Sequence, residues 1–289
     1  MNKPPHTILF MPARNERPTI AFNLTQALRA IKQGELSHVA LVIDAPEDET
    51  SEIIERQLSK HGFEQQPREE FSLEHPPSGL IIVDNKRPLG KGACFVQAVN
   101  AISKQTSAFQ DPHAVMVNVD ADAEALNMFT VTALAARLRK HKDWPMLLGQ
   151  HLEQSTSGYS VATPTSTGFR AIRLSALASI TEEHQHWTSL FPAGFGMDLA
   201  LNLLFHGEKQ AGLQQAEDLP LTFLRSFRHA TQQDQQLQHR LVEKAYRELV
   251  VNRSKSYAPS YPLAFETIKQ HAQEAEHHAG TTRRGRRAK

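Results

Sequence analysis

The sequence has few of the features that mark an exported or membrane-bound protein. Its 289 residues include one cysteine, Cys94, which excludes an internal disulfide and a cysteine metal cluster and is typical of the reducing cytoplasm. No apolar run approaches the ~20 residues needed to cross a bilayer, and the first one, from Thr7, is too short for a signal peptide. We therefore expect a soluble, cytoplasmic protein.

An excess of charge of either sign is also lacking. The chain carries 32 basic and 31 acidic residues, for a formal charge of +1, which argues against a surface built to meet nucleic acid or acidic membrane. The basic residues that do cluster lie in the tail at 280–289, which has almost no apolar residues and is expected to be a disordered, solvated terminus.

Short apolar runs alternate with helical patterns over the first part of the chain. The runs predict strands, and apolar residues spaced three or four apart predict helices near 20–31, 52–60 and 92–103. Alternation of this kind implies parallel strands joined by crossover helices, and so an α/β fold with a mainly parallel sheet flanked by helices. The predicted strands are Thr7–Met11, Val39–Ile43, Leu80–Val83, Ala114–Val119 and, later, Met146–Leu148.

Acidic residues follow each of the first four predicted strands: Glu16, Asp44, Asp84, and the pair Asp120 and Asp122. Ligands of open parallel sheets bind beyond the carboxyl ends of the strands, so these side chains are expected to meet at one edge. Carboxylates that share a cleft repel one another unless a cation neutralises them, and a divalent ion does so directly.

The motif Asp120-Ala121-Asp122 leaves a buried strand in a turn, where two carboxylates can direct oxygen atoms at one hard cation. We therefore expect Mg²⁺ or Mn²⁺ here, where it would neutralise a diphosphate leaving group. An Asp-x-Asp pair taken alone also occurs as a solvated turn or a helix N-cap.

A second candidate site is the loop at 87–93, in which Lys91 stands between Gly90 and Gly92 at the start of a predicted helix. Glycines allow close approach of an anion, and lysine supplies a positive charge at the helix N-terminus. The loop lacks the Walker A spacing, and no GxGxxG follows the first strand, so the sequence gives no support for a P-loop NTPase or a Rossmann dehydrogenase.

Taken in order, these motifs resemble those of GT-A glycosyltransferases, especially the soluble retaining group that includes glucosyl-phosphoglycerate and mannosylglycerate synthases. The resemblance extends from about residue 7 to 230. It rests on Phe10-Met11-Pro12-Ala13-Arg14-Asn15-Glu16, Leu41-Val42-Ile43-Asp44, Gly90-Lys91-Gly92, Asp120-Ala121-Asp122, Thr167-Gly168-Phe169-Arg170, Gly194-Phe195-Gly196-Met197-Asp198 and Arg228-His229.

For the donor, the resemblance implies that a nucleotide-sugar, UDP- or GDP-linked, binds in residues 1–123. Pro12, Ala13 and Glu16 would border the nucleoside, Asp44 would contact the base, Lys91 and Asp120 would lie at the nucleotide, and Asp120, Asp122 and His229 would hold the metal. Histidine is an acceptable ligand for Mn²⁺. The alternative for His229 is an ordinary surface histidine.

For the acceptor, the resemblance implies that residues 124–232 form the second half of the same domain, with Gly168 and Arg170 contacting a small or soluble acceptor. Asp198 stands where such enzymes carry glutamate and is the candidate catalytic carboxylate; as an alternative, it is a favourable charge at a helix N-terminus. A helical extension is expected at 233–279. The resemblance further implies transfer of a hexose with retention, and it leaves a homodimer open.

Two other functions fit the same pattern. A nucleotidylyltransferase shares a nucleotide-binding sheet and uses Mg²⁺, although a glycine-rich basic loop would usually follow its first strand. A non-catalytic module would keep the fold but show no metal-dependent affinity for nucleotides.

Overall fold

The computed structural model describes residues 5–63, 79–123, 126–149, 151–155, 158–161, 168–183, 197–198, 201, 205 and 222–224, with the side chains of 151–161, 179–183 and 222–224 left out. His229, the predicted extension at 233–279 and the basic tail lie outside the described residues.

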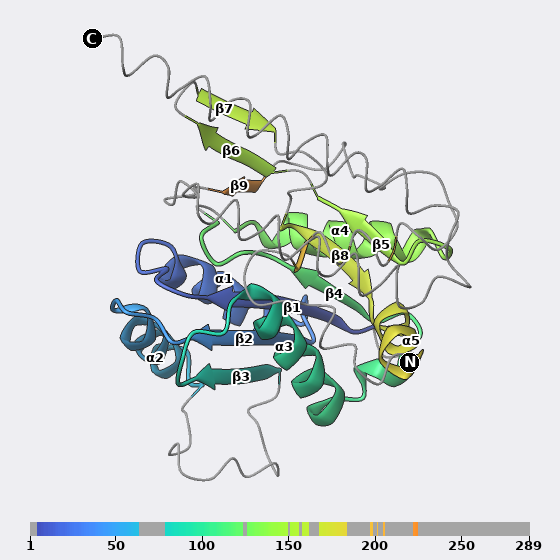
Figure 1. The fold of residues 1–289 in the computed structure, drawn as a ribbon, viewed down its shortest axis with the longest axis horizontal. Coiled ribbons are helices and arrows are strands. Elements are labelled where there is room, and N and C mark those ends of the chain that lie inside the picture. The colour runs from blue at the N-terminus through green and yellow to red at the C-terminus, as the bar shows by residue number, and fades with distance from the viewer. Residues whose placement is uncertain are drawn as a thin grey trace, which may run out of the picture.

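A six-stranded sheet forms the centre of the molecule (Figure 1), with the strand order β3-β2-β1-β4-β8-β5. The first four strands in this order are parallel, while β8 runs antiparallel to both of its neighbours. The prediction of a mainly parallel sheet is therefore confirmed. The strands are β1 (Thr7–Ala13), β2 (His38–Asp44), β3 (Leu80–Asn85), β4 (Val115–Asn118), β5 (Met146–Leu148) and β8 (Arg170–Arg173).

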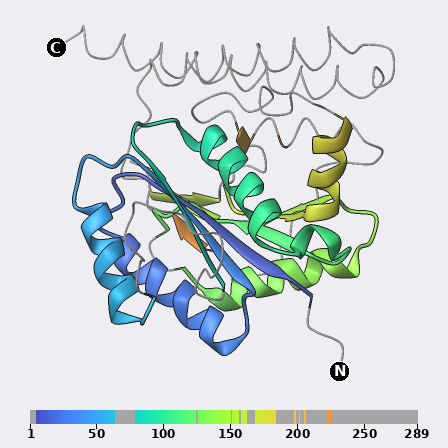
Figure 2. The ribbon, with the colours of Figure 1, turned by 90° about the horizontal axis from the view of Figure 1, so that it is seen from below.

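Helices cover both faces of this sheet (Figure 2). On one face lie α1 (Ile20–Gln33), α2 (Thr50–Lys60) and α4 (Met128–Lys140), and on the other lie α3 (Lys91–Gln105) and α5 (Leu174–Glu183). A short 3-10 helix, η1 (Ala108–Gln110), precedes β4. Helix α1 ends at Gly34, whose φ of 75° places it in the left-handed region that glycine adopts without strain.

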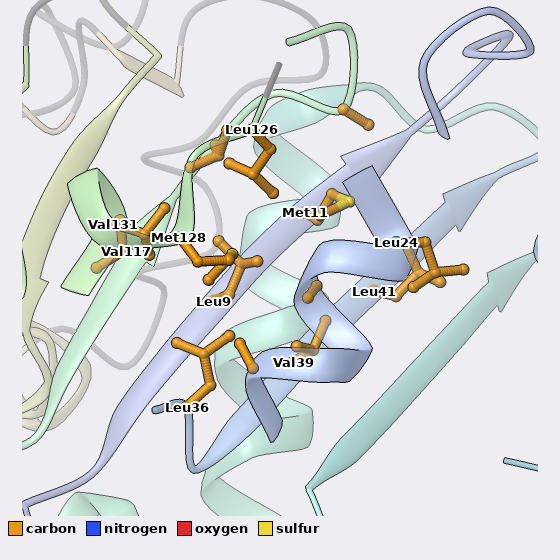
Figure 3. Packing of buried hydrophobic residues seen from close by; sticks show 14 of the residues in the cluster. Leu9, Met11, Leu24, Leu36, Val39, Leu41, Val117, Leu126, Met128 and Val131 are labelled. Atoms are coloured by element: carbon orange, nitrogen blue, oxygen red, sulfur yellow. The ribbon is translucent and has the colours of Figure 1, made fainter. Parts of the chain in front are cut away.

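Strand β1 shows how the two apolar cores are divided. Leu9 and Met11 point to the face covered by α1 and α4 (Figure 3), where they pack in one buried cluster with Leu24. Ile8 and Phe10 alternate with them and join the opposite cluster, below α3. A strand buried on both faces must be apolar throughout, which explains the continuous runs from which these strands were predicted.

A smaller sheet accompanies the first, with strand order β7-β6-β9. Its strands are β6 (His151–Ser155), β7 (Gly158–Val161) and β9 (Thr222–Leu224). In the part of the chain that the structure describes, no helix is both long and apolar enough to cross a membrane.

Candidate active site

The sheet order gathers the predicted donor residues at one edge. Strands β2, β1 and β4 are consecutive and parallel, so their carboxyl ends lie together (Figure 1). Pro12 and Ala13 end β1, Asp44 ends β2, and Asp120 follows β4. The structure thus brings these predicted donor-binding residues together at the carboxyl ends of the parallel strands.

The loops that follow β1 and β2 are joined by hydrogen bonds. The backbone N–H of Glu16 donates to the Thr50 hydroxyl at 2.8 Å, and that of Glu47 donates to the Asn15 side chain at 2.6 Å. Asn15 and Ala45 have φ values of 55° and 44°, a left-handed conformation that is uncommon for alanine. Strain of this kind is often found where a loop is held open for a ligand.

Asp44 holds the loop that follows β3. Its carboxylate is buried and accepts hydrogen bonds from the backbone N–H groups of Leu89 and Gly90, at 2.8 and 2.9 Å, and from the Asn85 side chain at 3.1 Å. Asp44 therefore fixes the start of α3, and with it the position of Lys91. The predicted contact of Asp44 with a base stays a prediction.

Lys91 connects the turn after β4, which carries Asp120, with the segment that carries Asp198. Its ammonium lies 2.7 Å from Oδ1 of Asp120 and 2.9 Å from Oδ2 of Asp198, residues that come from different parts of the chain. Burial alone lowers the pKa of Lys91, but the two carboxylates outweigh it and raise the pKa above the ordinary lysine value. Lys91 is thus a permanent cation between two acidic side chains.

Arg170 holds the same Asp198 from the other side. Its side chain is completely buried, with one guanidinium nitrogen 3.1 Å from Oδ1 of Asp198 and another donating to the Asp198 carbonyl at 2.9 Å. Burial lowers the pKa of Arg170, against the opposing charges of Asp198 and Asp120, yet a guanidinium stays protonated at neutral pH. Both carboxylate oxygens of Asp198 therefore face cations.

Gly168 lies directly against the Lys91–Asp120 pair. A β-carbon built on this residue would come 2.1 Å from Oδ2 of Asp120 and 2.8 Å from the Lys91 ammonium, so no other residue fits without movement of the pair. Asn118, the last residue of β4, donates to the Gly168 carbonyl at 2.6 Å. The structure places Gly168 and Arg170, both predicted to contact the acceptor, beside the predicted metal-binding turn.

The turn itself offers oxygen ligands. Asp120 and Asp122 carry hard carboxylates of the kind that Mg²⁺ and Mn²⁺ prefer, and Asp120 belongs to the charged cluster with Lys91, Asp198 and Arg170. Within the described ranges, no group of three His, Cys, Asp or Glu side chains is arranged to hold a metal ion. A metal held by Asp120 and Asp122 would therefore need further ligands from a nucleotide or from another residue.

Two residues that the sequence did not single out hold this turn in place. The Thr19 hydroxyl donates to the Ala121 carbonyl at 2.7 Å, and the Asn23 side-chain amide donates to the carbonyls of Ala121 and Ala123 at 2.9 and 2.7 Å. Both side chains are buried. The sequence signal was two polar residues four apart, Thr19 just before α1 and Asn23 on its apolar side.

Solved structures with this architecture exist at low sequence identity. Glucosyl-3-phosphoglycerate synthase of M. tuberculosis matches with a TM-score of 0.54 and 14% identity, over 85% of this chain and 80% of that one. The fold is that of a GT-A glycosyltransferase. The predicted fold is thereby confirmed, and the predicted enzyme class, glycosyltransferase, is the class of these structural neighbours.

Two further neighbours were solved with ligands. The same M. tuberculosis enzyme in complex with Mn²⁺, UDP and phosphoglyceric acid matches with a TM-score of 0.54 and 13% identity, over 85% of this chain and 78% of that one. S. aureus TarS in complex with UDP matches with a TM-score of 0.52 and 15% identity, over 84% and 65%. No protein-family model and no curated protein matches the sequence.

Proposed function

We propose that this GT-A fold protein is a metal-dependent glycosyltransferase that moves a hexose from a nucleotide-diphosphate sugar to a small or soluble acceptor. The observation that carries the proposal is the chain of charges Asp120–Lys91–Asp198–Arg170 at the carboxyl edge of the sheet. It joins the nucleotide half of the fold to the half that would bind the acceptor, with the Asp120–Asp122 turn at the junction.

The donor would lie along the carboxyl ends of β1, β2 and β4. Pro12, Ala13 and Glu16 would border the nucleoside, and Asp44 the base. Asp120, Asp122 and His229 would hold Mg²⁺ or Mn²⁺, and this ion would neutralise the diphosphate as it leaves. The neighbours that bind UDP, one of them with Mn²⁺, support this arrangement.

Within this site, Lys91 would stabilise negative charge that develops on the diphosphate. Its ammonium is already placed at Asp120 by the Asp44-bound loop, so little reorganisation is needed when a phosphate approaches, which is the condition for effective electrostatic stabilisation. Gly168 and Arg170 would border the acceptor.

We further propose that the reaction retains the anomeric configuration. Inversion requires a carboxylate that is free to take the proton of the acceptor, and the candidate carboxylate, Asp198, has one oxygen against Lys91 and the other against Arg170. Such pairing suits a residue that orients its neighbours better than it suits a base. Anomeric analysis of the product by NMR tests this directly.

The decisive experiment for the function is calorimetric titration with UDP and GDP, with and without Mn²⁺. We expect one nucleotide to bind, and to bind more tightly when Mn²⁺ is present. Affinity for neither nucleotide, or affinity that Mn²⁺ does not change, would contradict the proposal and favour a non-catalytic module. Release of pyrophosphate from a nucleoside triphosphate and a sugar phosphate would instead identify a nucleotidylyltransferase.

A further inference from the structure

The amide of Asn23 bridges the backbone on both sides of Asp122. Its nitrogen donates to the carbonyl of Ala121 at 2.9 Å and to that of Ala123 at 2.7 Å, and its oxygen accepts from the backbone N–H of Leu126 at 3.3 Å. One side chain therefore uses both of its N–H donors and one acceptor position of its oxygen on Ala121, Ala123 and Leu126.

Thr19 adds a second contact to the same segment. It precedes the first residue of α1, and its hydroxyl donates to the Ala121 carbonyl at 2.7 Å. Thr19 and Asn23 are both almost fully buried, as are Ala121 and Ala123. Water therefore has little access to these carbonyls, and loss of the two donors would leave them without replacement partners.

Other contacts of the turn include the ion pair of Asp120 with Lys91. Within it, the backbone N–H of Ala123 donates to the Asp120 carbonyl at 3.2 Å. Because the carbonyls before and after Asp122 are both bound to α1, this part of the turn is restricted in how it can tilt. The backbone on both sides of Asp122 is thus held from α1, across 98 to 100 residues of sequence.

We propose that Asn23, supported by Thr19, is a positioning residue that orients the Asp120 and Asp122 carboxylates toward the metal and diphosphate. The inference rests on the proposed function, because it presumes that this turn meets a metal-bound nucleotide. Asn23 itself contacts neither ligand. Hydrogen bonds that orient ligating groups typically change metal affinity by about 10- to 100-fold when they are removed.

The test is Mn²⁺ binding at saturating UDP, followed by electron paramagnetic resonance, in wild type, Asn23→Ala and Asn23→Asp. The aspartate variant keeps the size of the side chain but loses both donors. We expect about 10- to 100-fold weaker Mn²⁺ binding in both variants, with affinity for UDP measured without metal unchanged within about twofold, because the nucleoside loop is not altered.

Two controls separate positioning from stability. Leu28→Ala destabilises the same helix at a buried position in its third turn, and Thr25→Val removes a hydrogen bond from α1 to Gln57 on α2. Neither residue contacts the turn through a described hydrogen bond. We expect both controls to bind Mn²⁺ as wild type does. If Leu28→Ala loses as much Mn²⁺ affinity as Asn23→Ala, or if the Asn23 variants bind Mn²⁺ normally, the inference is wrong.

If the Asn23 variants do not fold, the pair Thr19→Val and Thr19→Ser replaces them. Serine keeps the hydroxyl that bonds Ala121, and valine keeps the shape without it, so only Thr19→Val is expected to weaken Mn²⁺ binding; equal affinity in the two variants would overturn the inference. Failure of the proposed function would look different, because wild type would then show no metal-dependent binding of UDP.

Discussion

The ammonium of Lys91 lies 2.7 Å from the Asp120 carboxylate and pairs with its charge. The contact joins the first residue of α3 to the turn after β4. Lys91 and a metal would therefore act on the same carboxylate, the lysine from the side of α3 and Asp198. This relation makes Lys91 the first residue to test.

Replacement of Lys91 by methionine should weaken binding of UDP by about 1.5–3 kcal/mol, the contribution of a hydrogen bond to a charged group. The matched control is Lys86→Met, because Lys86 belongs to the same loop but its side chain is 80% exposed and pairs with Asp84. Calorimetric titration gives both affinities. Equal affinity in the two variants would show that Lys91 serves only to pair Asp120 and Asp198.

Asp122→Ala should abolish turnover and leave the fold intact, because Asp122 lies in a turn and not in the apolar core. Loss of a direct metal ligand should reduce turnover by more than about 100-fold, which is the upper range for loss of a group that only orients a ligand. Turnover is measured at saturating donor and Mn²⁺, with circular dichroism to check the fold. The exposed Asp143→Ala is the control, and turnover unchanged in Asp122→Ala would remove this residue from the site.

Arg170→Met should destabilise the protein, because it leaves the Asp198 carboxylate with one cation in place of two. Removal of one partner of a buried pair costs about 3–5 kcal/mol, and the Arg170 side chain is fully buried. Urea denaturation measures the loss. The double variant Arg170→Met with Asp198→Asn should recover part of it, since no uncompensated charge remains; no recovery would mean that the arginine acts through packing alone.

Cys94 provides a test of pH dependence. Burial, and then the neighbouring Asp44 carboxylate, raise the pKa of its thiol from 9.0 to about 12. A folded-state pKa that is raised favours the fold below the unfolded value and loses this effect as pH rises. The stability of wild type relative to Cys94→Ala should therefore fall between pH 9 and 10.5, by at most about 1.4 kcal/mol per pH unit.

The same shift predicts that the thiol is unreactive in the folded protein. Cys94 should resist a disulfide reagent at pH 8 and react fully in denaturant, since the thiolate is the reactive form. Rapid modification of the native protein, or a stability difference from Cys94→Ala that does not change with pH, would contradict the assigned environment.

Sequence patterns predicted the first five strands of the large sheet because each is an apolar run buried on both faces. Strand β8 was missed for the opposite reason: it carries Arg170 and Arg173, both buried, which makes the run look polar. The partner that makes burial of Arg170 tolerable, Asp198, stands 28 residues later. A local sequence pattern cannot show that a buried arginine is paired with a carboxylate so far along the chain.

The residues of the candidate site were likewise predictable only in part. The acidic residues at the strand ends were predictable, because topology alone places them at one edge. Their partners were not, because these are set by the tertiary structure: Asp44 accepts from backbone N–H groups 45 and 46 residues away. Asn23 looks like an isolated polar residue on an apolar helix face until the turn after β4 packs against it.

The reversed direction of β8 has a consequence for how specificity can vary. Because β8 is antiparallel to β4, with Arg170 opposite Asn118, β8 contributes residues to the site from its N-terminal end. Strands β1, β2 and β4 contribute residues from their C-terminal ends. Sequence changes at the start of β8 would therefore alter the proposed acceptor side without changing the loops after β1, β2 and β4, which would read the nucleotide. On the proposed function, donor and acceptor preferences would be encoded in separate stretches of the gene, so that either could diverge while the other is preserved.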